Sequence, residues 1–327
     1  NTAVGYSAGL QITTGNGNTA MGYAAMASSD GDVASLYNTF IGAYAGNGSW
    51  GGAPVDNNTG IGYGAMGAGA MNNSTDNVAV GFESGHDITS GDNNTLVGAN
   101  SGEKITTGGN NVAIGKGAGA TITSGGSNVI IGTSAGDAII DSSNHVLIGT
   151  GAGGNGDIVN DGQTAVGYLA LHSLTSGQQN TAVGYQALDA EVDGDYSTAI
   201  GYAALTSQTG TDGPVHNTAV GANSLGGTTT GTHNIGVGSN VLLTASTALR
   251  NTAIGFNAMT DTKAGIAVAD CVAIGYDALK GHSSNTTTGV SGSVAIGKSA
   301  LSALTTGAGN TAVGYNSLMT ATTEIGN

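Results

Sequence analysis

A short repeat sets the phase of the whole sequence. The chain opens on Asn-Thr-Ala-Val-Gly-Tyr, and close variants of this string return through all 327 residues. The glycine of each copy marks eighteen positions, and ten of the seventeen gaps between them are 17 residues long. The positions are Gly5, Gly22, Gly42, Gly62, Gly81, Gly98, Gly115, Gly132, Gly149, Gly167, Gly184, Gly201, Gly221, Gly238, Gly255, Gly275, Gly297 and Gly314. Such a period predicts that each copy is one rung, which buries its apolar residues only by stacking on its neighbours.

Each copy reads as a strand followed by a turn. β-Branched residues precede the phase glycine, and turn-forming residues gather at the far end of the copy. A second apolar cluster, such as Ala187 and Leu188, follows the glycine and predicts a return strand. We therefore expect an all-β fold, a parallel β-solenoid or β-roll of about eighteen 17-residue coils, in which Gly98, Gly115 and Gly132 line up along one axis.

Alternation along the strand divides its side chains between two faces. Counted from the phase glycine, positions −3 and −1 share one face, while position −2, mostly Ala, and the glycine share the other. We expect the β-branched pair to point inward, so that residues such as Ile114 and Ile131 form continuous interior rows. The Ala/Gly face would then be smooth enough for another chain to pack against it.

An asparagine column precedes the strands. Position −4 is Asn in thirteen of the eighteen copies, including Asn18, Asn38, Asn94, Asn111 and Asn180. Stacked one coil apart, these amides can hydrogen-bond along the array, so we predict a structural ladder rather than a ligand site.

Residues 1–327 read as one repeat array with longer turn loops near 46–56, 211–216, 260–270 and 280–292. Asn327 falls where the next copy would begin, so we expect the array to continue in a longer chain. Loops on one edge of a solenoid usually carry binding specificity. Trp50, the single tryptophan, lies in the first loop and is a candidate contact for a glycan or a protein, although anchoring of its own loop is an equal alternative.

Composition argues against several functions. The chain has 21 acidic and 6 basic residues and a formal charge of −15, which opposes binding to nucleic acid. No apolar run is long enough to insert this segment into a membrane. Cys271 is the single cysteine and occupies the asparagine slot, where we expect a small inert side chain. His216 and His233 share one phase and should stack, but no carboxylate or cysteine completes a ligand set, and we predict no metal and no cofactor.

Tyrosines follow the phase glycine in several copies, among them Tyr168, Tyr185 and Tyr202. Such a column could stack on sugar rings. The alternative, which we favour, is that the rings pack between chains or cover the edge of the coil.

We do not expect one chain to be stable alone in this architecture, because burying a few small aliphatic side chains per coil returns little free energy against the entropy lost in ordering the coil. We therefore predict a parallel homo-oligomer. The units Asn1 to Gly5 and Asn111 to Gly115 resemble the head repeats of trimeric autotransporter adhesins and related repeats of phage tail fibres. That resemblance implies a left-handed coil, three chains about a common axis, and an extracellular adhesive role. The period of about 17 residues is longer than the adhesin repeat.

The expected function is a structural or adhesive fibre segment at the cell surface, outside the cell or on a virion. Identical chains would present identical loops for multivalent attachment to a surface glycan or protein. The sequence leaves two alternatives. A glycan-degrading β-helix enzyme would need a carboxylate pair in a groove, and an ice- or crystal-binding solenoid would need a regular Thr-x-Thr column.

Overall fold

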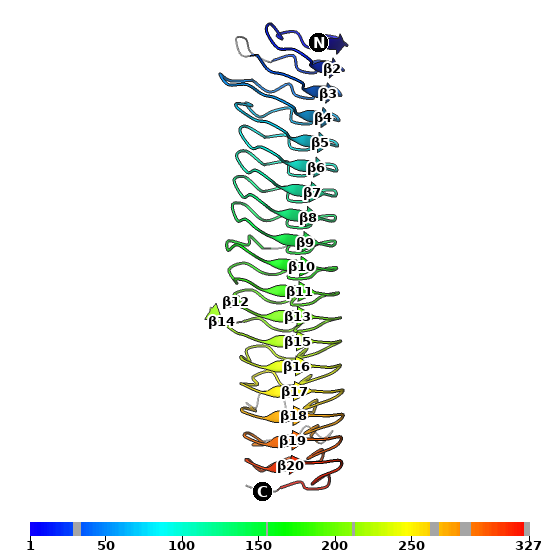
Figure 1. The fold of residues 1–327 in the computed structure, drawn as a ribbon, viewed down its shortest axis with the longest axis vertical. Coiled ribbons are helices and arrows are strands. Elements are labelled where there is room, and N and C mark those ends of the chain that lie inside the picture. Colours follow the sequence, from blue (N-terminus) through cyan, green and yellow to red (C-terminus); the bar gives the residue numbers. More distant parts are fainter. Residues whose placement is uncertain (29–33, 155, 211–212, 262–267, 282–288, 324–327) are drawn as a thin grey trace. The chain divides into compact units, whose positions relative to one another are not determined.

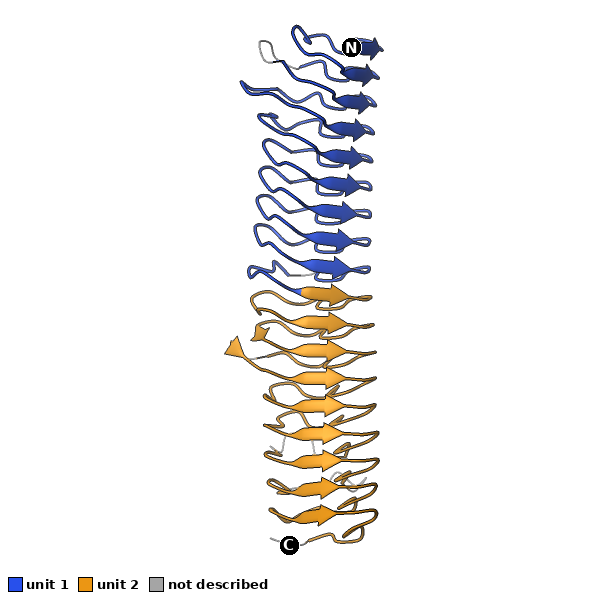
Figure 2. Cartoon of the chain, in the orientation of Figure 1, with its two compact units in different colours: residues 1–163 blue, residues 164–327 orange. Residues whose placement is uncertain are grey.

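The chain is a parallel β-solenoid, with turns of about 17 residues. The computed structural model describes residues 1–28, 34–154, 156–210, 213–261, 268–281 and 289–323. It divides into two compact units, residues 1–163 and 164–327 (Figure 2). Parts of the predicted loops at 211–216, 260–270 and 280–292 lie outside the described residues.

In the first unit, one three-residue strand per coil pairs in parallel with the strand of the next coil (Figure 1). The strands are β1 (Thr2–Val4), β2 (Thr19–Met21), β3 (Thr39–Ile41), β4 (Thr59–Ile61), β5 (Val78–Val80), β6 (Thr95–Val97), β7 (Val112–Ile114), β8 (Val129–Ile131) and β9 (Val146–Ile148). Equivalent residues are partners, as in Val97 with Ile114 and Ile114 with Ile131. The predicted register is therefore confirmed here.

The second unit repeats this arrangement. Its main strands are β10 (Thr164–Val166), β11 (Thr181–Val183), β13 (Thr198–Ile200), β15 (Thr218–Val220), β16 (Ile235–Val237), β17 (Thr252–Ile254), β18 (Val272–Ile274), β19 (Val294–Ile296) and β20 (Thr311–Val313). Two short strands, β12 (Gly194–Asp195) and β14 (Gly213–Pro214), pair beside them.

The phase glycines lie where successive backbones approach closely. Gly98, Gly115 and Gly132 have backbone φ angles of +136°, +134° and +139°, a region that residues other than glycine rarely adopt. A Cβ atom added to Gly98 would overlap the carbonyl group of Gly115, and one added to Gly115 would overlap that of Gly132. The glycine column is thus required by both backbone conformation and space.

The prediction of the inward face was wrong. Ala113, at position −2, is fully buried, whereas Ile114 is 37% exposed and Ile131 is half-buried. Residues later in the same coil, such as Ala118 and Ile122, are fully buried as well and share the interior with the inward strand position. The inward position is alanine in most coils and a larger side chain in others, such as the fully buried Leu96, Ile130 and Leu147. The β-branched pair lies outside, where it still favours the extended backbone.

The predicted return strand is also absent from the described residues. After the phase glycine, the chain turns through residues in the left-handed region, for example Gln186 and Leu188, both at φ +51°. A left-handed residue breaks an extended run, so this segment cannot form a strand. It still bonds to the next coil, since the Leu188 N–H donates to the Ala204 carbonyl at 3.0 Å.

Candidate functional site

The side chains at the first and third position of each main strand form the surface that we call the outer sheet face. They point away from the interior because the middle residue points into it. Many of its large aliphatic residues are at least a third exposed: Val4, Met21, Ile61, Val78, Val97 and Ile114 in the first unit, and Ile200, Ile235, Val237, Ile254, Ile296 and Val313 in the second. Adjacent exposed apolar side chains are characteristic of interaction sites, which makes this face a candidate.

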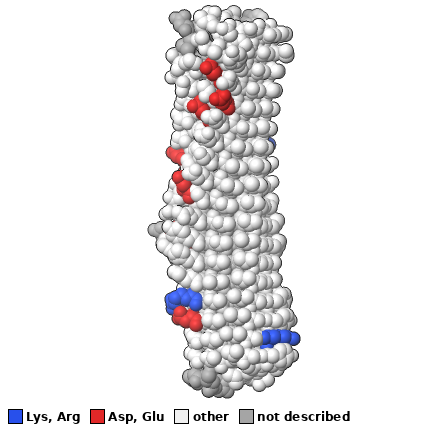
Figure 3. Space-filling view, in the orientation of Figure 1, with Lys and Arg blue, Asp and Glu red and all other residues white. Residues whose placement is uncertain are grey.

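Charge is absent from this face. None of the eighteen copies has Asp, Glu, Lys or Arg at position −3 or −1, although the chain carries a net charge of −15. In the view of Figure 3, charged side chains cover only a small part of the visible surface. An uncharged face of aliphatic and threonine side chains on an acidic protein can meet a similar face without repulsion at the contact.

An aromatic column borders the outer sheet face. In the first unit, the rings of Tyr6 and Tyr23 stack with centroids 5.3 Å apart, and Tyr63 stacks on Phe82 at 5.4 Å. Tyr44 joins the two pairs through edge contacts with Tyr23 and Tyr63. These rings are exposed at their outer edges, so the column extends the apolar surface sideways.

In the second unit, Tyr168, Tyr185 and Tyr202 form a stack with centroid distances of 5.1 Å and 5.4 Å. Both faces of Tyr185 are therefore covered by its neighbours, and only its edge and hydroxyl group are presented outward. A sugar ring needs a free aromatic face to stack on, which Tyr185 does not offer. Farther along, Lys298 lies over the rings of Tyr276 and Tyr315, at 5.6 Å and 5.7 Å, and continues the column through cation–π contacts.

The candidate contact at Trp50 is not on the surface. Its side chain is 5% exposed, its ring lies 6.1 Å from that of Phe40, and its Nε1 donates to the Gly46 carbonyl at 3.2 Å. Trp50 therefore anchors its loop. The sequence held a signal for this, because Phe40 occupies the column that is usually Ala, and Gly60 follows it in the next coil, where a larger side chain would overlap the Phe40 ring.

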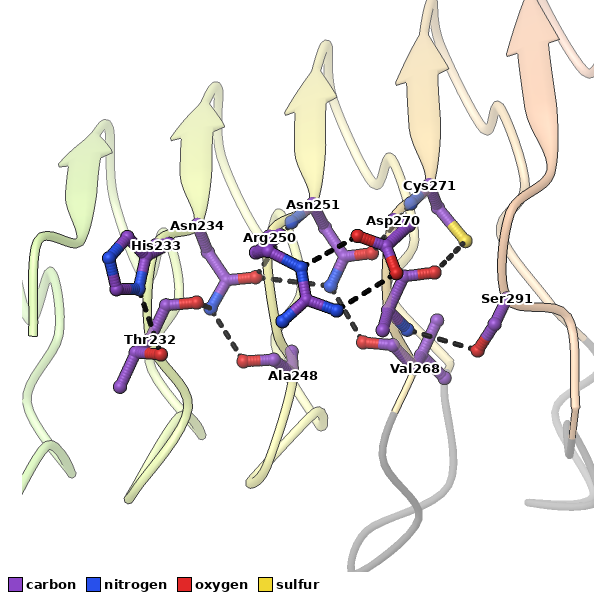
Figure 4. Close-up of polar contacts among 11 residues, drawn as sticks. Thr232, His233, Asn234, Ala248, Arg250, Asn251, Val268, Asp270, Cys271 and Ser291 are labelled. Carbon is purple, nitrogen blue, oxygen red and sulfur yellow. Dashed lines mark hydrogen bonds and ion pairs between the residues drawn. The ribbon is translucent and has the colours of Figure 1, made fainter.

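The asparagine side chains hydrogen-bond from coil to coil. In the close-up of Figure 4, Asn251 Nδ2 donates to Asn234 Oδ1 at 3.0 Å and to the Val268 carbonyl at 2.8 Å. Asn38 and Asn18 are joined in the same way, as are Asn111 and Asn94, and Asn180 donates to the Gly194 carbonyl. The column therefore has a structural role, since these side chains are buried and their polar atoms are hydrogen-bonded within the chain.

Residues that replace asparagine in this column need other partners. The Cys271 thiol lies 3.3 Å from the Val290 carbonyl, and burial raises its pKa to about 11. Beside Ser197, the buried Gln208 donates to the Ser197 hydroxyl at 3.0 Å and accepts from Asn217 Nδ2 at 2.8 Å. Gln208 also donates to the buried Glu191, a network that the break in the asparagine column could have signalled.

His216 and His233 stack, with ring centroids 5.1 Å apart, and Tyr196 continues the stack on the other side of His216. In the next coils, Arg250 forms a bidentate ion pair with Asp270, at 2.7 Å and 2.9 Å (Figure 4). No group of three or more metal-ligating side chains occurs among the described residues.

A hollow of about 340 Å³ in the first unit is lined by Ile140, Asp141, Ser142, Asp157, Val159 and Asp161. Its carboxylates are hydrogen-bonded within the chain: Asp157 accepts from the Ile140 N–H, and Asp161 from the Ser143 N–H. Hydrogen bonds from Thr123 and Ser124 lower the pKa of Asp141. These carboxylates therefore support turns.

Comparison with known proteins finds no matching protein-family model and no similar curated sequence. Across the described residues, no helix has the length and apolar character needed to cross a membrane.

Proposed function

We propose that this chain is a structural and adhesive segment of an extracellular, cell-surface or virion fibre, whose copies associate through the outer sheet face. The observation that carries the proposal is the row of uncharged aliphatic side chains at the third strand position of each coil, exposed or half-buried along each unit. Such a row loses contact with water only when a partner covers it.

A second copy of the chain is the partner that suits this face best. Exposed residues recur with the spacing of the coils, and an identical chain repeats at the same spacing, so that each contact made by one coil is made again by the next. In a parallel assembly, like residues lie at the same level. The resemblance of the repeat to adhesin heads supports three chains about a common axis and a left-handed coil.

The same resemblance, together with the repeated turns at the coil edges, supports attachment to a surface glycan or protein. Tyr168, Tyr185 and Tyr202 would contribute ring edges and hydroxyl groups to such contacts. Several weak contacts from identical chains add up through their effective concentration. The proposed role involves no reaction and no cofactor.

Native mass measurement with paired variants tests this proposal. The unaltered chain is expected at three times its 31.5 kDa mass. The double substitution Ile114→Glu and Ile131→Glu places charges on the outer sheet face and is expected to give monomers. Ser90→Glu with Thr107→Glu adds the same charges at exposed positions in neighbouring coils away from that face and is expected to leave the mass unchanged. A monomeric unaltered chain with native circular dichroism would refute self-association.

A further inference from the structure

His145 occupies the buried asparagine column, between Asn128 and Gln163, and is fully buried. Its backbone N–H donates to Asn128 Oδ1 at 3.0 Å, as an asparagine at this position would. Its ring, however, is titratable, unlike an amide. At this position of the column, hydrogen bonding therefore depends on the protonation state of the His145 imidazole, and so on pH.

The contacts of the ring determine where its proton lies. The Gln163 backbone N–H donates to Nδ1 at 3.2 Å, so Nδ1 is an acceptor and carries no proton. Nε2 lies 2.8 Å from the Ser142 hydroxyl oxygen and donates to it, while that hydroxyl group donates to the Ile158 carbonyl. Every donor and acceptor in this chain of bonds is matched only when the imidazole is neutral.

We propose that His145 makes the contact between its coil and Gln163 in the next coil sensitive to acid. Protonation of Nδ1 places a ring N–H opposite the Gln163 backbone N–H, and two donors that face each other separate. The neighbouring contact would be lost with it, since the Val146 N–H, at the start of β9, donates to the Gln163 carbonyl at 2.9 Å. Coils built on asparagine amides contain no group that titrates in this way and would remain stacked.

The surroundings of the ring favour its neutral form. Burial lowers the pKa of His145 to about 4, and the nearby Asp161 carboxylate opposes this only in part. Asn128, Ser142 and Gln163, which contact the ring or its backbone, are uncharged, while Asp141 and Asp157 line the hollow beside Ser142. In an opened coil, the imidazole returns to its ordinary pKa near 6.5.

The direction of the effect follows from these two values. Well above pH 6.5 the ring is neutral in both the closed and the opened coil, so the opening equilibrium does not depend on pH through His145. As the pH falls from 6.5 towards 4, the opened coil binds a proton that the closed coil does not, so opening increases about tenfold per pH unit. The full increase is on the order of a hundredfold, and below pH 4 it levels off.

Amide hydrogen exchange on the full chain, corrected for the intrinsic effect of pH on exchange, tests whether this contact opens in acid. Between about pH 7 and about pH 4.5, exchange at Val146 and Gln163 is expected to rise on the order of a hundredfold. His145→Asn restores the usual residue of the column and is expected to abolish the rise. His172→Asn, at a partly exposed histidine, is the matched control and should behave as the unaltered chain.

Nuclear magnetic resonance of the unaltered chain gives a second test that needs no variant. The His145 ring is expected as the Nε2–H tautomer at neutral pH and should stay neutral until the coil opens. An acid response that persists in His145→Asn, or a ring that titrates at its ordinary pKa with no change in exchange, would overturn the proposal.

Discussion

Asn111 is joined to Asn94, its equivalent in the preceding coil, by two hydrogen bonds to one oxygen atom. The Asn111 backbone N–H donates to Asn94 Oδ1 at 3.0 Å, and Asn111 Nδ2 donates to the same atom at 3.1 Å. Nδ2 also donates to the Gly125 carbonyl at 2.9 Å, and Asn111 Oδ1 accepts twice from Asn128. One buried side chain therefore satisfies polar groups of neighbouring coils.

Asn111→Ala should destabilise this part of the first unit by about 3 kcal/mol, because buried donors and acceptors lose their partners. Thermal unfolding, followed by circular dichroism, and hydrogen exchange in the adjacent coils measure the loss. Asn72→Ala, at an exposed asparagine of the same unit, is the control and should change stability by less than about 0.5 kcal/mol. Equal effects of the two substitutions would contradict a structural ladder.

Gly115→Ala should destabilise the chain by about 2 to 4 kcal/mol, since the new methyl group meets the Gly132 backbone and the residue is held at φ +134°. Gly51→Ala provides the comparison, because a Cβ atom there meets nothing within 4 Å. Denaturant unfolding measures both variants. If Gly115→Ala were as stable as Gly51→Ala, successive coils could not be as close as the structure places them.

Cys271 should resist alkylation in the folded chain. Burial raises the pKa of its thiol to about 11, so the reactive thiolate is scarce at about pH 8. As pH rises above the ordinary value of 9.0, the unfolded chain releases this proton first, and folding becomes less favourable. Mass spectrometry after iodoacetamide treatment should show label only in denaturant, whereas a cysteine introduced at the exposed Ser90 should react in both states. Fast labelling of native Cys271 would exclude its buried position.

Trp50 should report a buried environment. Its fluorescence is expected to be blue-shifted and poorly quenched by acrylamide in the native chain, with both properties lost on unfolding, because the ring packs beside Phe40. Phe40→Ala should increase quenching, and because Trp50 is the single tryptophan, the whole change comes from this site. Strong quenching of the native chain would show that Trp50 is available for a ligand.

The repeat spacing was sufficient to predict the stacked coils and the alignment of Gly98, Gly115 and Gly132. It also placed Asn94 and Asn111 one above the other, where short buried amides have few partners other than each other. These features depend on period alone, and period can be read directly from a sequence.

The orientation of the strand could not be read in this way. Alternation separates Ala113 from Ile114, but which of them points inward depends on the path of the chain after the strand, and that path runs through left-handed residues after the glycine. Bulky residues such as Leu188 rarely adopt that conformation, so nothing in their identity signals it. Residue size does not decide it either, because both Ala113 and its partner in the next coil, Ile130, are fully buried at the inward position.

Disulfide cross-linking tests most directly whether copies meet at the outer sheet face. In a Cys271→Ser background, Ile114→Cys should form cross-linked dimers on mild oxidation of the assembled chain, because parallel copies bring this residue face to face. Ala113→Cys, inside the coil, and Ser90→Cys, at an exposed turn, should remain uncross-linked. Cross-links that form at Ser90→Cys but not at Ile114→Cys would place the contact between copies elsewhere and contradict the proposed assembly.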